Sequence, residues 1–280
     1  MATLSPLDHD RLHEALALAH AAIGLSDPNP RVGCVIGHAD GRVLATGFTQ
    51  EAGGDHAEAA ALRAARAAGV DVRGATAWVT LEPCAHHGRT PPCCYALIAA
   101  GIARVVVGVE DPFHLVAGRG IEQLRAAGVQ VDLADEAFAQ ACRELNIGFH
   151  TRVTRGRPWV RMKVAASLDG RTALPDGTSQ WITAEPARAD GHAWRRRAGA
   201  VLSGIGTVLE DDPRLDVRLV PTAKQPLRVV VDSHLMTPLH ARLLAPPGPV
   251  LIVGAADEPS RIDALRAEGA EVVLLPGEHG

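Results

Sequence analysis

The chain has 280 residues, of which 47% are hydrophobic, 21% charged and only 3% aromatic, and its formal net charge is −4. This length fits one large domain or two ordinary ones, and the composition is that of a soluble globular protein with a mainly aliphatic core. The densest basic run is Arg195-Arg196-Arg197, so a general nucleic-acid-binding role is not expected.

The N-terminal residues and the cysteines indicate in which cellular compartment the protein is expected. The N-terminal stretch lacks the basic region and unbroken apolar run of a secretory signal, and no segment approaches the ~20 apolar residues that cross a bilayer. The cysteine number is odd, and three of the five cluster beside histidines: Cys34, Cys84, Cys93, Cys94 and Cys142. This pattern favours metal ligation in a reducing cytoplasm over a disulfide framework.

The first half predicts alternating helices and strands. Apolar residues recur at helical spacing over 7–24, and strands at 32–36 and 43–47 flank Asp40-Gly41, a dipeptide typical of hairpin turns. The remaining predicted elements are a helix from about 57 to 68, a strand at 75–81, a helix at 93–101, a strand at 105–109, a helix at 121–127, a strand at 129–133 and a helix at 137–147. Such alternation indicates a layered α/β domain.

A polar stretch at 151–158 predicts a linker, which divides the chain into domains at 1–148 and 157–280. The alternation then resumes. The expected elements are a strand at 160–165, a helix at 186–197, strands at 200–203, 227–232 and 250–253, a helix at 260–268 and a strand at 271–275. The second half is therefore expected to be α/β as well.

Three features in the first half point to a metal site. His56-Ala57-Glu58 stands at a predicted helix start, Cys84 directly follows a predicted strand, and Cys93 begins the next helix. Zinc deaminases use one histidine and two cysteines as ligands with water in the fourth position, while a nearby glutamate moves protons without binding the metal. A helix N-terminus also favours the thiolate form of Cys93.

Several alternatives remain at this site. Asp55 and Glu58 fit a capping box in which Asp55 is the N-cap residue. Cys94 competes with Cys93 as a ligand, and His86 or His87 could add a ligand that closes a purely structural zinc site. We expect Cys34 and Cys142, which sit in apolar patterns, to be structural. The glutamate two residues after the histidine favours a catalytic site.

Several segments carry a family resemblance. They are residues 28–33 (PNPRVG), 56–58 (HAE), 79–93 (VTLEPCAHHGRTPPC), 116–120 (VAGRG), 163–171 (KVAASLDGR), 179–183 (SQWIT) and 206–213 (GTVLEDDP). Together they closely resemble the bifunctional pyrimidine deaminase/reductases of riboflavin biosynthesis, the RibD family, over nearly the whole chain. That family separates its two cysteine ligands by eight residues, as here, which favours Cys93 over Cys94.

The resemblance implies a fold and two reactions. It implies a three-layer cytidine-deaminase-like domain followed by a dihydrofolate-reductase-like α/β domain. With Zn²⁺, and with Glu58 as proton shuttle, the first would hydrolyse the 2-amino group of a diamino-hydroxy-pyrimidine that carries a phosphoribosylamino group. The second would reduce the ribosyl chain to ribityl with NADPH. A small phosphorylated substrate, a homo-oligomer and a cytoplasmic location are expected, with neither nucleic acid nor membrane as partner.

Residue roles in the second half come from the resemblance alone. It implies nucleotide contacts by Ala165, Trp181, Thr207, Asp211 and Ser233. It implies binding of the second substrate by Ser179, Arg195, Leu215 and Arg218. The run Gly204-Ile205-Gly206 is no dinucleotide fingerprint, so the sequence by itself names no cofactor here. Considered singly, Arg195 fits a solvated arginine and Trp181 a core residue.

Two departures from the family matter. The sequence has Asp111-Pro112-Phe113-His114 where the family usually has Asp-Pro-Asn-Pro, near the expected deaminase pocket. The family also continues beyond the position of Gly280 for roughly a quarter of its length, with a Glu-Gly-Gly segment, so we expect a truncated and weak reductase. The competing hypotheses are another zinc deaminase, acting on a nucleoside, guanine or a tRNA base, and a non-catalytic zinc-stabilised binding module.

Overall fold

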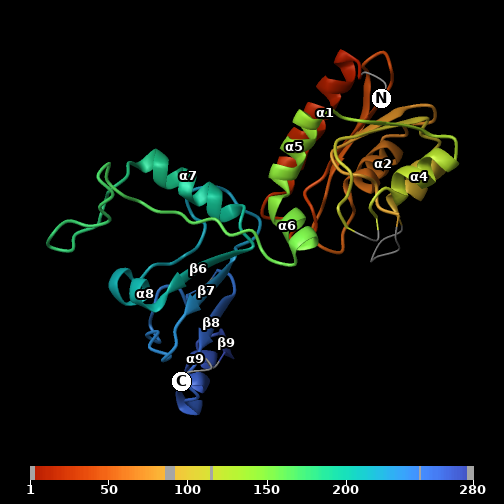
Figure 1. Cartoon of the computed structure of the whole chain (residues 1–280). Coiled ribbons are helices and arrows are strands. Elements are labelled where there is room, and N and C mark those ends of the chain that lie inside the picture. Colours follow the sequence, from red (N-terminus) through yellow and green to blue (C-terminus); the bar gives the residue numbers. More distant parts are fainter. Residues whose placement is uncertain (1–3, 86–91, 114–115, 246, 276–280) are drawn as a thin grey trace. The chain divides into compact units, whose positions relative to one another are not determined.

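The computed structural model describes residues 4–85, 92–113, 116–245 and 247–275 (Figure 1). The chain divides into two compact units, Met1–Val160 and Arg161–Gly280. None of the helices in the described ranges has both the length and the apolar character needed to span a bilayer.

A five-stranded mixed sheet forms the centre of the first unit, with strand order β2-β1-β3-β4-β5. Its strands are β1 (Gly33–Gly37), β2 (Val43–Phe48), β3 (Thr76–Val79), β4 (Arg104–Val107) and β5 (Gln130–Leu133). β1 pairs antiparallel with β2 and β3, which confirms the predicted hairpin, whereas β3, β4 and β5 run parallel. The carboxyl ends of the parallel strands share one edge, where α/β sheets hold their ligands.

Helices cover both faces of this sheet (Figure 1). They are α1 (Pro6–Ala19), the short 3₁₀ helix η1 (His20–Ala22), α2 (Ala57–Ala67), α3 (Cys93–Ala99), α4 (Arg119–Ala126), α5 (Glu136–Leu145) and α6 (Ile147–Arg155). Glycines allow the closest approaches. A Cβ on Gly33 would lie 1.9 Å from the Ala15 carbonyl oxygen of α1, and a Cβ on Gly47 would lie 2.3 Å from the Ala57 carbonyl oxygen of α2. Gly47 pairs with Cys34, the neighbour of Gly33, so α1 and α2 lie on opposite faces. The result is three layers.

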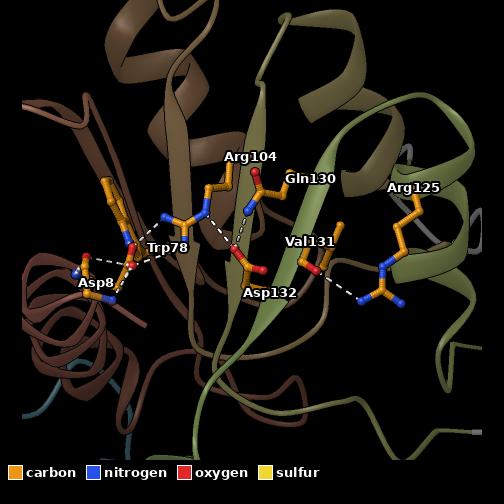
Figure 2. Close-up of polar contacts among 8 residues, drawn as sticks. Asp8, Trp78, Arg104, Arg125, Gln130, Val131 and Asp132 are labelled. Carbon is orange, nitrogen blue, oxygen red and sulfur yellow. Dashed lines mark hydrogen bonds and ion pairs between the residues drawn. The ribbon is translucent and has the colours of Figure 1, made fainter. Parts of the chain in front are cut away.

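A polar network ties α1 to the sheet (Figure 2). The buried Asp8 carboxylate accepts hydrogen bonds from Trp78 Nε1 at 2.8 Å and from Arg104 Nη1 at 2.7 Å. Arg104 Nε also donates to Asp132 on β5 at 2.7 Å. Asp8 forms a capping box with Ser5 at the start of α1 as well. The Asp8 carboxylate therefore connects α1 with β3 and β4, and Arg104 extends the network to β5.

Helix α6 occupies most of the stretch that the sequence predicted as a linker. Thr151 is buried and donates its hydroxyl to the Ile147 carbonyl at 2.7 Å. Phe149 packs against the core, and Gly156 ends the helix in a left-handed conformation. The prediction of a linker at 151–155 is therefore wrong. The polar side chains of Thr151 and Thr154 form hydrogen bonds to carbonyl groups of the same helix.

The second unit is built on a four-stranded parallel sheet with order β6-β7-β8-β9. Its elements are α7 (Glu185–Arg196), β6 (Ala200–Gly204), α8 (Ile205–Asp211), β7 (Leu227–Val231), β8 (Val250–Gly254), α9 (Pro259–Ala267) and β9 (Ala270–Leu274). Val230, Ile252 and Leu265 are fully buried in its core. The strand and helix predictions from 186 onward are confirmed, and α8 is an addition to them.

One predicted strand of this half is wrong. Residues 160–165 are extended but form no strand with any described residue. Val160 is 79% exposed and Met162 is 85% exposed. Their apolar pattern is that of a strand, but a strand exists only where a neighbour accepts its hydrogen bonds. Here the described part of β6 pairs only with β7.

Candidate metal centre

Three separate elements bring the predicted zinc ligands together. His56 is the N-cap residue of α2, Cys84 follows β3, and Cys93 is the first residue of α3. Their ligand atoms all lie within 4.8 Å of one another. His56 Nδ1 is 3.6 Å from Cys84 Sγ and 3.5 Å from Cys93 Sγ.

These separations fit a tetrahedral zinc ion. With bonds of about 2.0 Å to nitrogen and 2.3 Å to sulfur, tetrahedral geometry places ligand atoms roughly 3.3–3.8 Å apart. Cys94 is outside this cluster, because its buried thiol donates to Gln123 Oε1 at 2.9 Å. Cys34 and Cys142 are buried in the core, as predicted. His86 and His87 lie outside the described residues.

The two thiols lie close enough to shift each other's pKa values. A hydrogen bond from the Cys93 thiol lowers the pKa of Cys84 despite its burial, and His56 adds to this effect. The same interaction raises the pKa of Cys93 well above its usual range. The hydrogen bond with Cys84 also raises the pKa of His56. Metal ligands of this kind bind as thiolates and neutral imidazole, so the donor set suits a metal ion.

Glu58 lies beside the ligands without being one of the three. It occupies the first turn of α2 and is only 3% exposed. Burial first, and the Cys84 charge second, raise the pKa of Glu58 to about 7. A carboxyl group with this pKa can take up and release a proton near neutral pH.

The capping-box interpretation of this turn is wrong. The N-cap residue is His56 rather than Asp55, and the His56 side chain makes no capping hydrogen bond. Asp55 instead forms an ion pair with Arg63 at 3.0 Å. Glu58 therefore has no capping role that would explain its burial.

A cavity of about 770 Å³ opens over this cluster. Its walls are formed by Pro28, Asn29, Pro30, Val32, Thr49, Ala52, Gly53, Gly54, His56, Glu58, Leu81, Cys84, Asp111, Phe113, Phe149, Arg152 and Val153. Burial raises the pKa of the Asp111 carboxyl to about 6. Phe113, at the position where the family pattern departs, is one of the walls, and His114 lies outside the described residues.

Sequence reasoning missed Phe149 and Arg152, whereas the expected position of Asp111 and Phe113 near the pocket is confirmed. Phe149 and Arg152 are three residues apart on α6, so both point from one helical face. Because this stretch was predicted as a linker, the helical spacing of these two residues was not considered. Arg152 is the only arginine or lysine among the described residues that line the cavity.

In the second unit, some of the expected residues are brought together. The backbone carbonyl of Asp216 accepts from Arg195 Nη1 at 3.1 Å, and its carboxylate accepts from Arg218 Nη1 at 2.9 Å. Leu215, next to it, is buried. Thr207 and Asp211 lie one turn apart on α8, after β6, and Ser233 follows β7. These two parallel strands end at the same edge, which suits a bound nucleotide.

The other expected residues lie in an irregular segment before α7. Ala165 and Ser179 are half-buried there. Trp181 is 68% exposed, and the Arg188 guanidinium lies 4.5 Å from its ring centre. The core interpretation of Trp181 is therefore wrong. Arg195 is half-buried and bonded, unlike a solvated arginine.

Comparison with known proteins identifies the family. Residues 6–109 match the cytidine and deoxycytidylate deaminase zinc-binding region, and residues 158–275 match the RibD C-terminal domain. A riboflavin biosynthesis protein RibD from Aquifex aeolicus is 43% identical over 271 residues, which cover 97% of this chain and 74% of the relative. The chain belongs to the RibD family. The Escherichia coli RibD is 46% identical over 254 residues, or 86% of this chain and 67% of the relative.

Solved RibD structures share the fold. Acinetobacter baumannii RibD superposes with a TM-score of 0.84 at 41% identity, covering 97% of this chain and 75% of that one. A Thermotoga maritima diaminohydroxyphosphoribosylaminopyrimidine deaminase/5-amino-6-(5-phosphoribosylamino)uracil reductase gives a TM-score of 0.83 at 35% identity, covering 96% and 81%. The expected cytidine-deaminase-like and dihydrofolate-reductase-like α/β folds are thus confirmed.

RibD membership makes the chain an enzyme of riboflavin biosynthesis with a deaminase zinc-binding region and a reductase domain. The zinc-binding region and the three clustered ligands identify the metal as Zn²⁺, and the RibD reductase domain implies NADPH. A small-molecule substrate is consistent with such an enzyme.

Proposed function

We propose that the first unit hydrolyses the exocyclic 2-amino group of 2,5-diamino-6-(5-phosphoribosylamino)pyrimidin-4(3H)-one. The observation that carries this proposal is the cluster of His56, Cys84 and Cys93 beside the buried Glu58, at the base of a 770 Å³ cavity. The Thermotoga maritima relative bears the name of this deaminase. A cavity of this volume accommodates a molecule of that size.

His56, Cys84 and Cys93 would hold the zinc ion. When bound, Zn²⁺ supplies Lewis acidity that makes water nucleophilic at neutral pH. The three ligands found among the described residues leave a fourth position open, as catalytic rather than structural sites do. The backbone N–H of Cys93 donates to Cys84 Sγ at 3.3 Å, which orients that ligand.

Glu58 is the proton carrier of the reaction. Its carboxylate would accept a proton from the attacking water and deliver it to the ring nitrogen; it would then accept the second proton, from the newly added hydroxyl group, and deliver it to the amine, which leaves as ammonia. The buried setting favours this task because it brings the pKa of the carboxyl close to neutral pH. His56 and Glu58 lie two residues apart at the start of α2, so this helix fixes ligand and proton carrier together.

The cavity walls supply substrate recognition. Phe113 and Phe149 offer apolar surfaces for the pyrimidine ring, and the Asn29 amide offers donors and an acceptor for its edge. Arg152 offers the positive charge for the phosphate group.

For the second unit, the proposal is reduction of the ribosyl side chain to ribityl. Ala165, Trp181, Thr207, Asp211 and Ser233 would contact NADPH, which supplies a hydride when bound. Ser179, Arg195, Leu215 and Arg218 would hold the substrate and its phosphate. The functional domains proposed are 1–148 and 157–280, in a cytoplasmic homo-oligomer that binds neither nucleic acid nor membranes.

Ammonia release tests the deaminase proposal. Purified protein should contain about one zinc per chain and release ammonia from the phosphoribosylaminopyrimidine. Glu58→Gln should lower this rate by roughly 10²–10⁴-fold with zinc retained, because proton transfer is lost. An unchanged rate in Glu58→Gln, or turnover of cytidine, guanine or a tRNA adenosine instead of the riboflavin precursor, would contradict the proposal.

A further inference from the structure

A second glutamate lies next to the metal centre and has a different set of partners. Glu82, two residues before Cys84, is only 3% exposed. Its carboxylate accepts four backbone hydrogen bonds: Oε1 from Gly120 at 2.9 Å and Ile121 at 3.2 Å, and Oε2 from Gly118 at 2.9 Å and Asp111 at 3.2 Å. All four donors belong to segments that follow β4.

Three of these donors are the first amides of α4. Gly118 is the N-cap residue of that helix and has no side chain with which to cap it. The first N–H groups of a helix have no partner inside the helix, and the helix dipole favours a negative charge there. Glu82 thus caps α4 from another element of the fold.

The start of α4 packs tightly against the turn that contains Glu82 and Cys84. A Cβ on Gly120 would lie 2.0 Å from the carbonyl oxygen of Pro83, the residue between Glu82 and Cys84. The Glu82 N–H also donates to the Val109 carbonyl at 2.9 Å. The start of α4 and the end of β4 are therefore pinned to the turn that carries Cys84.

The fourth donor leads into the cavity. Asp111 donates its backbone N–H to Glu82, while its side chain lines the cavity and accepts the Phe113 N–H at 2.8 Å. Phe113 is the next wall residue. The wall formed by Asp111 and Phe113 is thus held against the metal turn through one carboxylate.

We propose that Glu82 is a positioning residue of the deaminase site, which sets substrate affinity by fixing the wall of Asp111 and Phe113 relative to Cys84. The inference rests on the proposed deaminase function. It assigns Glu82 no contact with substrate or metal. The effect of a change at Glu82 should accordingly fall on KM more than on kcat.

The test is Glu82→Gln in the full chain, which keeps size but turns one acceptor oxygen into an N–H₂ group facing backbone donors. We expect KM for the phosphoribosylaminopyrimidine to rise about tenfold or more with kcat within about threefold. Amide exchange at Gly118, Gly120 and Ile121 should accelerate. The visible spectrum of the Co²⁺-substituted protein should be unchanged, because the three ligands keep their geometry.

Asp8→Asn is the matched control. It neutralises another buried carboxylate of the same unit, one that bonds Arg104 at the start of β4 and thus lies toward the other end of that strand. It should lower thermal stability and leave KM unchanged. A KM in Glu82→Gln within twofold of wild type, or a KM increase matched by Asp8→Asn, would overturn the inference and leave the proposed function standing.

A second variant covers the case in which Glu82→Gln does not fold. Gly118 has a φ of +81° and nothing within 4 Å of an added Cβ, so Gly118→Ala strains only the backbone that donates to Glu82. It should raise KM in the same direction, and an unchanged KM would count against the inference. Absence of ammonia release from the wild-type protein would overturn the proposed function and this inference with it.

Discussion

Trp78 on β3 donates its indole N–H to the carboxylate of Asp8 on α1 over 2.8 Å, and both side chains are buried. Arg104 closes the group from β4 through two bonds to the same carboxylate (Figure 2). A buried carboxylate with this many donors stays ionised, and removal of its charge leaves both partners unsatisfied.

Acid should weaken the first unit through Asp8. Burial raises the pKa of Asp8, but hydrogen bonds from Arg104, Trp78 and Ser5 outweigh it and hold the pKa well below its usual range. The stabilisation is therefore present above about pH 4 and lost as the pH falls further. Asp8→Asn should lower the free energy of unfolding by about 3–5 kcal/mol at pH 7.

Urea unfolding measures the free energy of unfolding of both proteins, and amide exchange in β3 and β4 reports on the first unit by itself. The difference between the wild-type protein and Asp8→Asn should shrink between pH 7 and pH 3. A difference that is constant with pH would show that the charge of Asp8 contributes nothing.

The neighbouring cysteines should differ in metal binding. Cys93→Ser should lose zinc after dialysis, since a ligand is removed, and ammonia release should fall with it. Cys94→Ser should keep about one zinc per chain, because Cys94 bonds Gln123 instead. Zinc analysis by atomic emission checks both, and zinc loss in Cys94→Ser alone would reverse the ligand assignment.

Arg152 should affect binding of the phosphorylated substrate. Arg152→Ala removes the cation at the cavity wall, and a charge-assisted hydrogen bond lost to phosphate should raise KM by roughly 10- to 100-fold. Arg155→Ala, on the last turn of the same helix and outside the cavity walls, is the control. Steady-state kinetics of ammonia release give the KM values of both variants. Equal KM values would show that Arg152 does not bind the phosphate group.

Ammonia release should exceed NADPH oxidation. Parallel sheets are normally covered on both faces, yet the apolar stretch 160–165 lies outside the sheet of the second unit, and Trp181 is 68% exposed. We expect NADPH oxidation to be roughly tenfold or more slower than ammonia release, because misplaced contacts cost rate. Both assays on one preparation check this, and equal rates would contradict it.

Local patterns predicted much of this protein. Hydrophobic spacing located the hairpin and most helices, and residue type with spacing located His56, Glu58, Cys84 and Cys93, because each stands at an element boundary. The role of Glu82 could not be predicted from the sequence. Its partners are residues 111–121, and nothing local distinguishes a capping carboxylate from a solvated one.

The failures have the same origin. Asp55 fits an N-cap by type, but His56 is the N-cap residue and the Asp55 carboxylate pairs with Arg63 instead. The stretch 160–165 has strand composition, but pairing depends on a neighbour elsewhere in the chain. Sequence reasoning is reliable here for what a segment prefers and unreliable for which partner it meets.

The absence of a side chain at Gly47 matters as much as the presence of one at His56. An added Cβ would lie 2.3 Å from the Ala57 carbonyl oxygen and 2.4 Å from the Ala61 nitrogen, so any substitution must push α2 away from the sheet. That helix carries both His56 and Glu58. In a saturation library selected for growth without supplied riboflavin, Gly47 should therefore tolerate almost no replacement, and its mutational profile would mimic that of a chemically active residue.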